Sequence, residues 1–186
     1  MKRKHKDIMR EAMPVRSKLS PHFTRNEFLR SQTAERKGIK NIPDRDQVYN
    51  MRALCSNLLE EIRSGIRKEI KSDALVIITS GFRCKKLNKA IGGSKTSQHM
   101  KGQAADLHIS GVSLFDAFKY IVSESGLQFD KCVWEFGSWI HISYSMYGNN
   151  RNEILSVNKV NSKNKWKLLD KCEVRNMQSE DELKWN

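Results

Sequence analysis

The stretch SQHMKGQAADLHI, residues 97–109, joins a polar segment to an apolar one. Its first half lacks an apolar period and contains Gly102, which is typical of a loop. Its second half, residues 104–109, reads as a β-strand, in which side chains alternate between the two faces. Asp106 and His108 therefore share one face, and His99 lies in the loop just before the strand. The stretch predicts a strand that presents a carboxylate and an imidazole together.

Three further segments predict strands. Residues 75–79, Leu-Val-Ile-Ile-Thr, form a short β-branched run that is typical of a buried strand. Residues 131–136 and 139–145 are joined around Gly137-Ser138, which predicts a β-hairpin. The sheet is therefore expected to be small and mainly antiparallel.

Helices are predicted mainly before these strands. Thr24 and Glu27 have the spacing of a capping box, so a helix is expected from Arg25 to Arg36, with its end at Gly38. Shorter helices are expected over residues 85–91 and 114–126.

A second, longer helix begins at Pro43-Asp44. Its apolar residues recur every three or four positions, so one stripe faces a core; they are Val48, Met51, Cys55, Leu58, Ile62 and Ile66. The fold class that follows is α+β, with N-terminal helices packed on the sheet.

Composition and charge set the wider frame. The 186 residues suit one domain with tails: a basic flexible arm over residues 1–18, a folded domain over 19–155 and a basic C-terminal extension over 156–186. Residues 157–169 are expected to add a strand or two, and the end of the chain to fray.

The 34 basic and 21 acidic residues give a net charge of +13. Such a surplus favours a polyanionic partner: nucleic acid, an anionic membrane or an acidic cell-wall polymer.

Four other classes of protein are disfavoured. The N-terminal sequence has no apolar h-region, so no secretory signal is expected, and no segment approaches the roughly 20 apolar residues of a membrane span. The four cysteines are widely spaced without a CxxC pair, which argues against a cysteine zinc module and against a disulfide scaffold. We expect reduced thiols.

Three residues could bind a metal. His99, Asp106 and His141 supply two imidazoles and one carboxylate, and a site of three protein ligands with an open fourth position suits catalytic zinc. The spacing by itself is weak evidence, since a chain with five histidines and many carboxylates offers such a triple by chance.

The motifs around these residues strengthen this interpretation. In order along the chain they are Ser80-Gly81-Phe82-Arg83, Leu87-Asn88, Gly92-Gly93, Ser97-Gln98-His99, Gly102, Ala104-Ala105-Asp106 and Trp139-Ile140-His141. Together they resemble the zinc D-Ala-D-Ala carboxypeptidase and peptidoglycan endopeptidase family, whose core is shared with the Hedgehog signalling domain. The resemblance is greatest to the branch that includes phage endolysins and covers residues 20–155, including Ile39-Lys40-Asn41-Ile42-Pro43.

The resemblance implies a fold and a set of roles. It implies the Hedgehog/DD-peptidase fold, one Zn²⁺ per chain bound by His99, Asp106 and His141, and an Arg83 that contacts substrate or polarises the scissile carbonyl. Zinc lowers the pKa of a bound water to about 7 and polarises a carbonyl oxygen. Without the motifs, Arg83 would read as one more surface cation.

Hydrolysis also needs a general base. Relatives often carry a glutamate three residues before the last histidine, but Ser138 stands there, and Glu135 is the nearest carboxylate. A two-residue turn at Gly137-Ser138 would pair Trp134 with His141, whereas a three-residue loop over 137–139 would pair Glu135 with His141. We expect the longer loop and Glu135 as the base; the alternative is a solvent-facing strand glutamate.

Four further residues have two interpretations each. Ser97 and Gln98 either orient the substrate or His99, or form a turn. His108 either lines the cleft or supports a ligand from behind. Trp139 either walls the cleft or packs in the core.

The functional hypothesis is zinc-dependent hydrolysis of peptide bonds in peptidoglycan stem peptides, as a carboxypeptidase or an endopeptidase. The alternative is a non-catalytic binding module of the same fold, attached to cell wall or to a protein. A specific nucleic-acid binder is disfavoured because no DNA-recognition helix motif, zinc-finger spacing or aromatic-basic signature is present.

We expect a monomer that adheres to anionic wall polymer by charge. Without a secretory signal, storage in the cytoplasm and action on the wall after release, as in a phage lysin, are expected.

Overall fold

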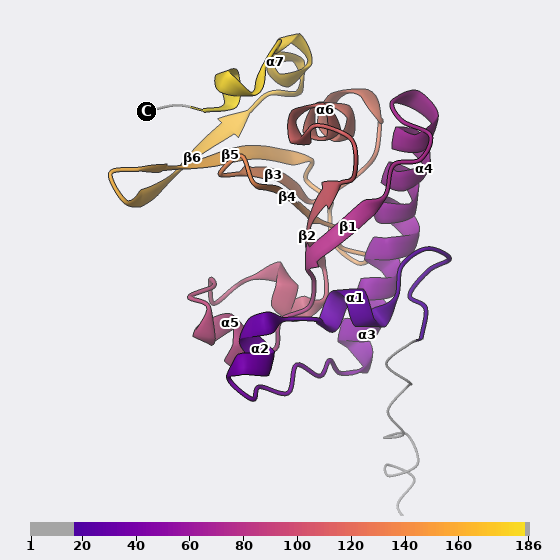
Figure 1. The fold of residues 1–186 in the computed structure, drawn as a ribbon, viewed down its shortest axis with the longest axis vertical. Coiled ribbons are helices and arrows are strands. Elements are labelled where there is room, and N and C mark those ends of the chain that lie inside the picture. Colours follow the sequence, from indigo (N-terminus) through magenta and orange to yellow (C-terminus); the bar gives the residue numbers. More distant parts are fainter. Residues whose placement is uncertain (1–16, 185–186) are drawn as a thin grey trace, which may run out of the picture.

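The fold is built on one six-stranded sheet with the strand order β1-β2-β4-β3-β5-β6 (Figure 1). The computed structural model describes residues 17–184, so nearly all of the predicted N-terminal arm lies outside the described residues. Every neighbouring pair of strands is antiparallel except β3 and β5, which are parallel. The expected α+β class is confirmed. The strands are β1 (Val76–Ser80), β2 (Ala104–Ile109), β3 (Lys131–Glu135), β4 (Trp139–Ser143), β5 (Glu153–Val160) and β6 (Lys163–Leu169).

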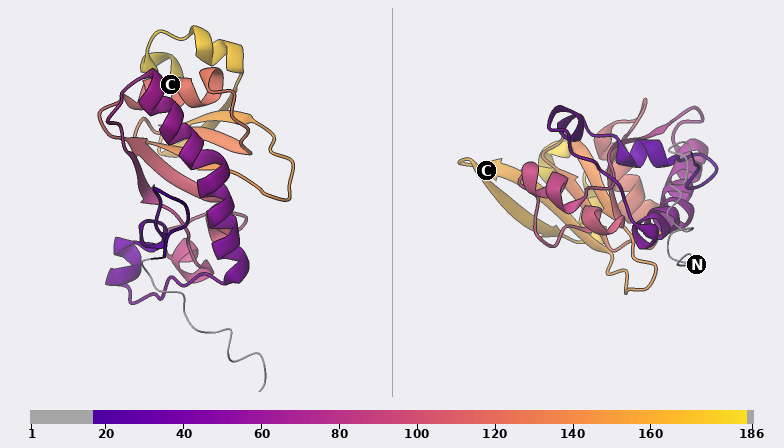
Figure 2. Two further views of the ribbon diagram at one scale, coloured as in Figure 1. Left: turned by 90° about the vertical axis from the view of Figure 1, so that its right-hand side faces the viewer. Right: turned by 90° about the horizontal axis from the view of Figure 1, so that it is seen from below.

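The predicted long helix is present as one run from α3 (Arg45–Leu54) through the π-helical turn η2 (Cys55–Leu59) to α4 (Glu60–Glu69). Asp44 caps it with a capping box. The predicted apolar stripe is buried, and the run lies along one face of the sheet (Figure 2). Its buried side chains belong to the same hydrophobic core as those of β1 and β2.

The first helix begins where predicted but ends early. The capping box of Thr24 and Glu27 is confirmed, and it starts α1 (Arg25–Leu29). The expected continuation to Arg36 is wrong, because a separate helix, α2 (Gln32–Arg36), follows.

Ser31 explains this break. Its hydroxyl accepts a hydrogen bond from the backbone N–H of Ala34 and so caps a new helix. A serine side chain that satisfies a free backbone N–H favours a helix start over a helix interior.

The remaining helices connect and cover the sheet. Residues 94–103, expected as a loop, contain the short 3₁₀ helix η3, which carries His99. All four cysteines are free thiols, as expected. Within residues 17–184, no helix combines the length and the apolar character needed to cross a bilayer. The remaining helices that connect and cover the sheet are α5 (Lys85–Ala90), η3 (Gln98–Lys101), α6 (Leu114–Lys119), η4 (Tyr120–Glu124), α7 (Lys171–Asn176) and η5 (Glu180–Leu183).

The C-terminal part of the chain belongs to this core. The boundary expected between residues 155 and 156 falls inside β5. The expected fraying is wrong for the described end of the chain, because Val174, Met177 and Leu183 are buried. Apolar side chains on α7 and η5 pack on the sheet and on η4. The basic charge of residues 156–186 had predicted an extension outside the folded domain instead.

Candidate active site

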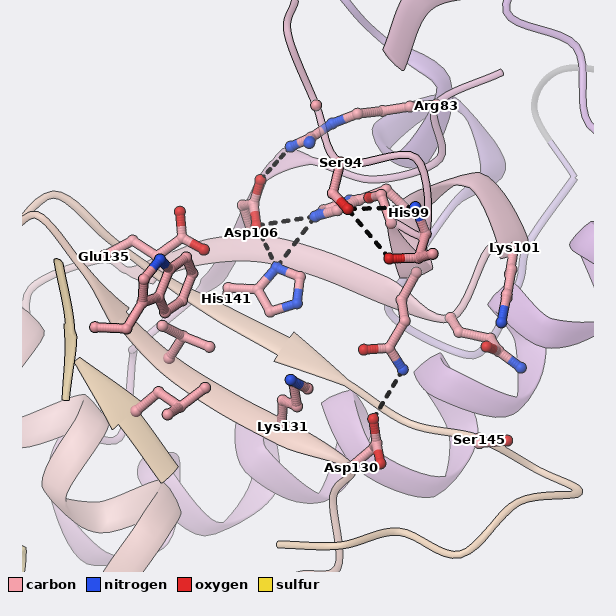
Figure 3. Close-up of a pocket in the computed structure, with 18 of the residues that line it drawn as sticks. Arg83, Ser94, His99, Lys101, Asp106, Asp130, Lys131, Glu135, His141 and Ser145 are labelled. Carbon is pink, nitrogen blue, oxygen red and sulfur yellow. Dashed lines mark hydrogen bonds and ion pairs between the residues drawn. The ribbon is translucent and has the colours of Figure 1, made fainter. Parts of the chain in front are cut away.

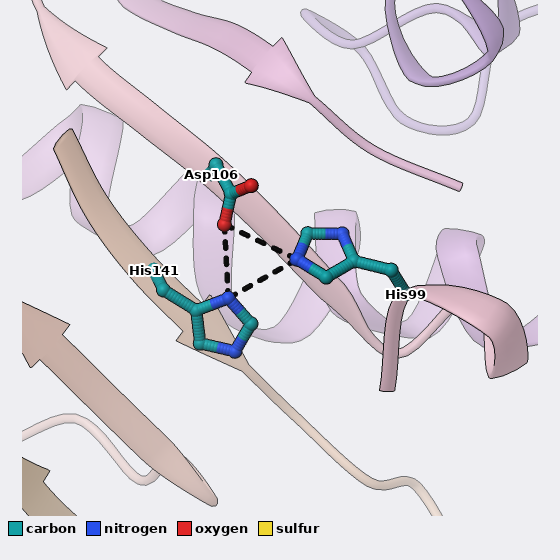
Figure 4. A group of neighbouring side chains, drawn as sticks. All are labelled: His99, Asp106 and His141. Carbon is teal, nitrogen blue, oxygen red and sulfur yellow. Dashed lines mark hydrogen bonds and ion pairs between the residues drawn. The ribbon is translucent and has the colours of Figure 1, made fainter. Parts of the chain in front are cut away.

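Three side chains from separate elements meet at one point (Figure 4). Asp106 lies on β2 and His141 on β4, and the two residues are direct partners in the antiparallel ladder. Residues opposite one another in such a ladder share a face. His99 comes from η3, which precedes β2, and its side chain reaches the same point.

The ligand atoms have the spacing of a metal site. His99 Nε2 lies 3.1 Å from Asp106 Oδ1 and 3.1 Å from His141 Nδ1, and His141 Nδ1 lies 2.9 Å from Asp106 Oδ1. Ligands about 2.05 Å from a tetrahedral zinc would be about 3.3 Å apart. The three atoms therefore need to separate by only a few tenths of an ångström to hold an ion.

The protonation states of His99 and Asp106 are also those that bind a cation. His99 Nδ1 donates a hydrogen bond to the carbonyl oxygen of Gly81 at 2.7 Å, and burial lowers the pKa of His99, so Nε2 presents its lone pair to the cluster. Burial raises the pKa of Asp106, but the two histidines outweigh it and hold that pKa well below its usual range. A neutral imidazole and an ionised carboxylate are the forms that bind zinc.

Arg83 fixes the carboxylate from its other side. Its Nη2 lies 2.5 Å from Asp106 Oδ2, and its Nε donates to the hydroxyl of Ser80 at 2.9 Å. Its backbone N–H donates to the carbonyl of His99 at 3.2 Å. Arg83 is thus bonded to two members of the cluster and orients both.

Asn41 holds the turn that carries Arg83, a role that its sequence context did not predict. Its amide nitrogen donates to the carbonyls of Leu29 and Phe82, and its amide oxygen accepts from the N–H of Cys84. The bonds to residues 82 and 84 flank Arg83 on both sides. The only sequence signal was the position of Asn41 inside one of the motifs.

Glu135 lies beside the cluster, but the predicted loop register is wrong. The loop covers residues 136–138, so Glu135 pairs with Trp139, and His141 pairs with Val133. Phe136 and Gly137 both have positive φ angles, 56° and 65°, and turn the chain one residue earlier than expected. Because Glu135 and Val133 are two residues apart, Glu135 still shares the face of His141.

The environment of Glu135 suits a proton acceptor. Burial raises its pKa, an effect that His141 partly opposes. The indole Nε1 of Trp139 donates to Glu135 Oε2 at 3.0 Å and favours the charged form. Raised carboxylate pKa values are typical of groups that exchange protons near neutral pH.

The cluster lies in a cleft of about 950 Å³, shown in Figure 3. The lining includes five residues predicted from sequence besides the cluster itself: Arg83, Glu135, Ser97, Gln98 and Trp139. His108 does not line the cleft, since it lies two residues further along β2, half-buried opposite Ile77.

The cleft also contains charged residues that no sequence motif predicted. Gln98 donates from Nε2 to Asp130 Oδ2 at 2.9 Å. Arg151 binds both oxygens of Asp130, at 2.7 and 2.8 Å, and this pairing lowers the pKa of Asp130. The network ties η3 to the loop before β5, so it stiffens the wall of the cleft next to His99. No spacing in the sequence links residues 98, 130 and 151.

The comparisons with known proteins agree with this geometry. Residues 21–143 match the family model described as Peptidase M15, and the matched range contains Arg83, Glu135 and all three residues of the cluster. No curated protein matches the chain.

Proposed function

The chain belongs to the peptidase M15 family, a family of metallopeptidases, and from this membership we propose that it hydrolyses peptide bonds in peptidoglycan stem peptides with zinc as cofactor. The observation that carries the proposal is the cluster of His99, Asp106 and His141, whose ligand atoms lie 2.9–3.1 Å apart in a cleft that also contains Glu135. Zinc bound there would supply Lewis-acid chemistry, which acidifies a water and polarises a carbonyl.

Glu135 is the proposed general base. Its Oε2 is engaged by the indole of Trp139, which leaves Oε1 to accept the proton of the attacking water. Its position on the same sheet face as His141 supports this role. The half-buried carboxylate has lost part of its hydration and is held by one hydrogen bond, so little reorganisation is needed when it takes up the proton.

Arg83 has two proposed roles. The bonds of its Nη2 and Nε to Asp106 and Ser80 support a positioning role, because they fix the carboxylate that would bind the metal. Contact with the scissile carbonyl would use Nη1. A guanidinium there would stabilise negative charge that develops on the carbonyl oxygen.

The proposed substrate is cell-wall peptidoglycan, reached after release of the protein. The net charge of +13 supports adhesion to anionic wall polymer, and such adhesion weakens as salt screens the charges. The proposed active form is a monomer, since one chain contributes every residue named for the reaction.

The test is incubation of purified peptidoglycan with the zinc-loaded protein, followed by mass spectrometry of the new termini. Free D-alanine would identify a carboxypeptidase, and a new D-glutamyl amino terminus without free D-alanine would identify an L-alanyl-D-glutamate endopeptidase. The matched control is the same protein after chelation, which should release nothing. A zinc-loaded protein that binds the wall but produces no new termini would contradict hydrolysis and support the binding module instead.

A further inference from the structure

Two rows of side chains run from the active site across the sheet to its edge. One row follows the register His141, Val133, Leu155, Leu168, and the other follows Trp139, Glu135, Val157, Trp166. Directly opposed residues share a face, so all eight side chains lie on the side of the sheet that carries the candidate metal site. Strands lie about 4.8 Å apart, which puts Trp166 about 10 Å from Glu135 across the sheet.

The outer ends of these rows are apolar and exposed. Trp166 is 55% exposed and Leu168 is 67% exposed, although both lie on a well-paired strand. We call Leu155, Trp166 and Leu168 the platform. The opposite face of the same hairpin is covered, since Ile154, Ser156 and Leu169 are buried there. One face of the hairpin therefore packs on the core, and the other face is exposed at the cleft.

The platform is continuous with the active-site cleft. Leu155, Trp166 and Asn164 line the same cleft as the metal cluster. Phe136 and Trp139 line the same cleft, and their rings contact edge to face with centroids 5.7 Å apart. A substrate that occupies the cleft can therefore extend across the sheet onto the platform.

We propose that the platform binds a sugar ring of the glycan strand to which the stem peptide is attached, a subsite that rests on the proposed function. The indole of Trp166 and the side chain of Leu168 supply a flat apolar surface for the C–H face of a pyranose. The amide of Asn164, on the same face two residues before Trp166, supplies a hydrogen-bonding group for a hydroxyl or an N-acetyl oxygen.

The chemistry of the platform favours a sugar over a peptide. An extended peptide is recognised chiefly through backbone hydrogen bonds at the edge of a sheet. The platform consists of side chains on the face of the sheet, whereas a peptide strand would pair along the outer edge of β6, the last strand in the order. A sugar requires no backbone partner, and an exposed tryptophan that adjoins a ligand cleft is typical of a binding surface rather than of a core.

The first experiment measures binding without catalysis. The probe is purified glycan strands from which the stem peptides have been removed, and the buffer contains 0.5 M salt so that general attraction by charge is screened. Trp166→Ala and Leu168→Ala should each weaken binding about tenfold. The matched control is Leu75→Ala, because Leu75 is 52% exposed but precedes β1 at the other edge of the sheet, and it should bind as the unaltered protein does. Equal binding by all the proteins would overturn the proposal.

The second experiment compares two substrates, the free stem peptide and the same peptide attached to its disaccharide. The ratio of their kcat/KM values should favour the attached form in the unaltered protein, and Trp166→Ala should lower that ratio about tenfold while Leu75→Ala keeps it. An equal loss on both substrates would show that the platform binds peptide, and would overturn the proposal. If neither substrate is cut, the proposed function fails, and the glycan-binding experiment still decides on the platform.

Discussion

The two ends of the cleft are built in opposite ways. At the metal end, His99 is 3% exposed and Asp106 6%, and each has partners on more than one side. At the platform end, Trp166 and Leu168 are more than half exposed, and their side chains contribute little to the core. The metal end lies within the residues that match the family, and β5 and β6 lie beyond them.

This difference reflects what each end has to do. Atoms that hold a metal must keep their positions within a fraction of an ångström, so they are buried and bonded to fixed backbone groups. A surface that binds a sugar needs only a flat shape and a few polar groups, and exposed side chains provide both. Changes at the metal end should therefore act on metal binding and catalysis, and changes at the platform should act on the choice of substrate.

Asp106→Asn should have the largest effect. The amide keeps the shape of the side chain but removes the charge that binds the cation and pairs with Arg83. We expect the zinc content to fall from about one per chain to near zero, with loss of hydrolysis. Metal analysis after gel filtration measures this. Asp73→Asn is the control, because the Asp73 side chain is 79% exposed. Trp166→Ala should keep its zinc; if it lost zinc as Asp106→Asn does, the two ends would not be independent.

Glu135→Gln should separate metal binding from chemistry at the metal end. The amide oxygen can still accept from the Trp139 indole, so the local structure is kept, but the group no longer takes up a proton. We expect full zinc content and a fall in kcat of about 10²- to 10⁴-fold. Zinc analysis and kcat on purified peptidoglycan check this together. Turnover close to that of the unaltered protein would exclude Glu135 as the base.

Asn41→Ala should weaken the metal end from a distance. The change removes two hydrogen bonds to the turn that carries Arg83 and a third to Leu29 in α1, so the Asp106 carboxylate is held less firmly. We expect zinc affinity to fall about tenfold, as measured by competition with a coloured chelator well below the melting temperature. Asn158→Ala is the matched control, since the Asn158 amide also donates to a backbone carbonyl, that of Leu183. An equal loss in both variants would indicate general destabilisation.

The pH profile should show the smallest effect. The proposed base, Glu135, would act in its charged form, so kcat/KM should be lost as pH falls through its pKa, and burial puts that pKa above the ordinary value for glutamate. Trp139→Phe removes a hydrogen bond that stabilises the charged form, so the acid limb should move to higher pH. Zinc content measured at each pH distinguishes this from metal release. A limb that moved to lower pH would contradict the assigned hydrogen bond.

Much of the fold and the site was predictable because the signals are local. The apolar period of residues 45–69 predicts the long helix, and the alternation of side chains puts Asp106 on a defined face of its strand. The ordered motifs selected His99, Asp106 and His141, and the structure brings these three together. The helix period and the strand alternation are properties of one continuous segment, and each motif is short, so none of these signals depends on contacts between distant residues.

Other features depended on competition between local conformations of similar energy. The hairpin after β3 turns one residue earlier than expected, because Phe136 and Gly137 adopt positive φ angles. The first helix breaks because Ser31 caps a new one. The energy differences between such alternatives are about 1 kcal/mol, which composition and spacing do not resolve.

The sequence by itself therefore determined the secondary-structure periods, the basic charge and the three residues of the candidate metal site. Apart from the β3–β4 hairpin, which the sequence predicted, tertiary structure decided which strands are neighbours, and with that the extent of the cleft. The parallel pairing of β3 with β5 joins segments with no shared pattern, and it brings Trp166 into line with Glu135. The physical reason is that alternation fixes the face on which a side chain lies, whereas its neighbours across the sheet depend on how the whole chain packs.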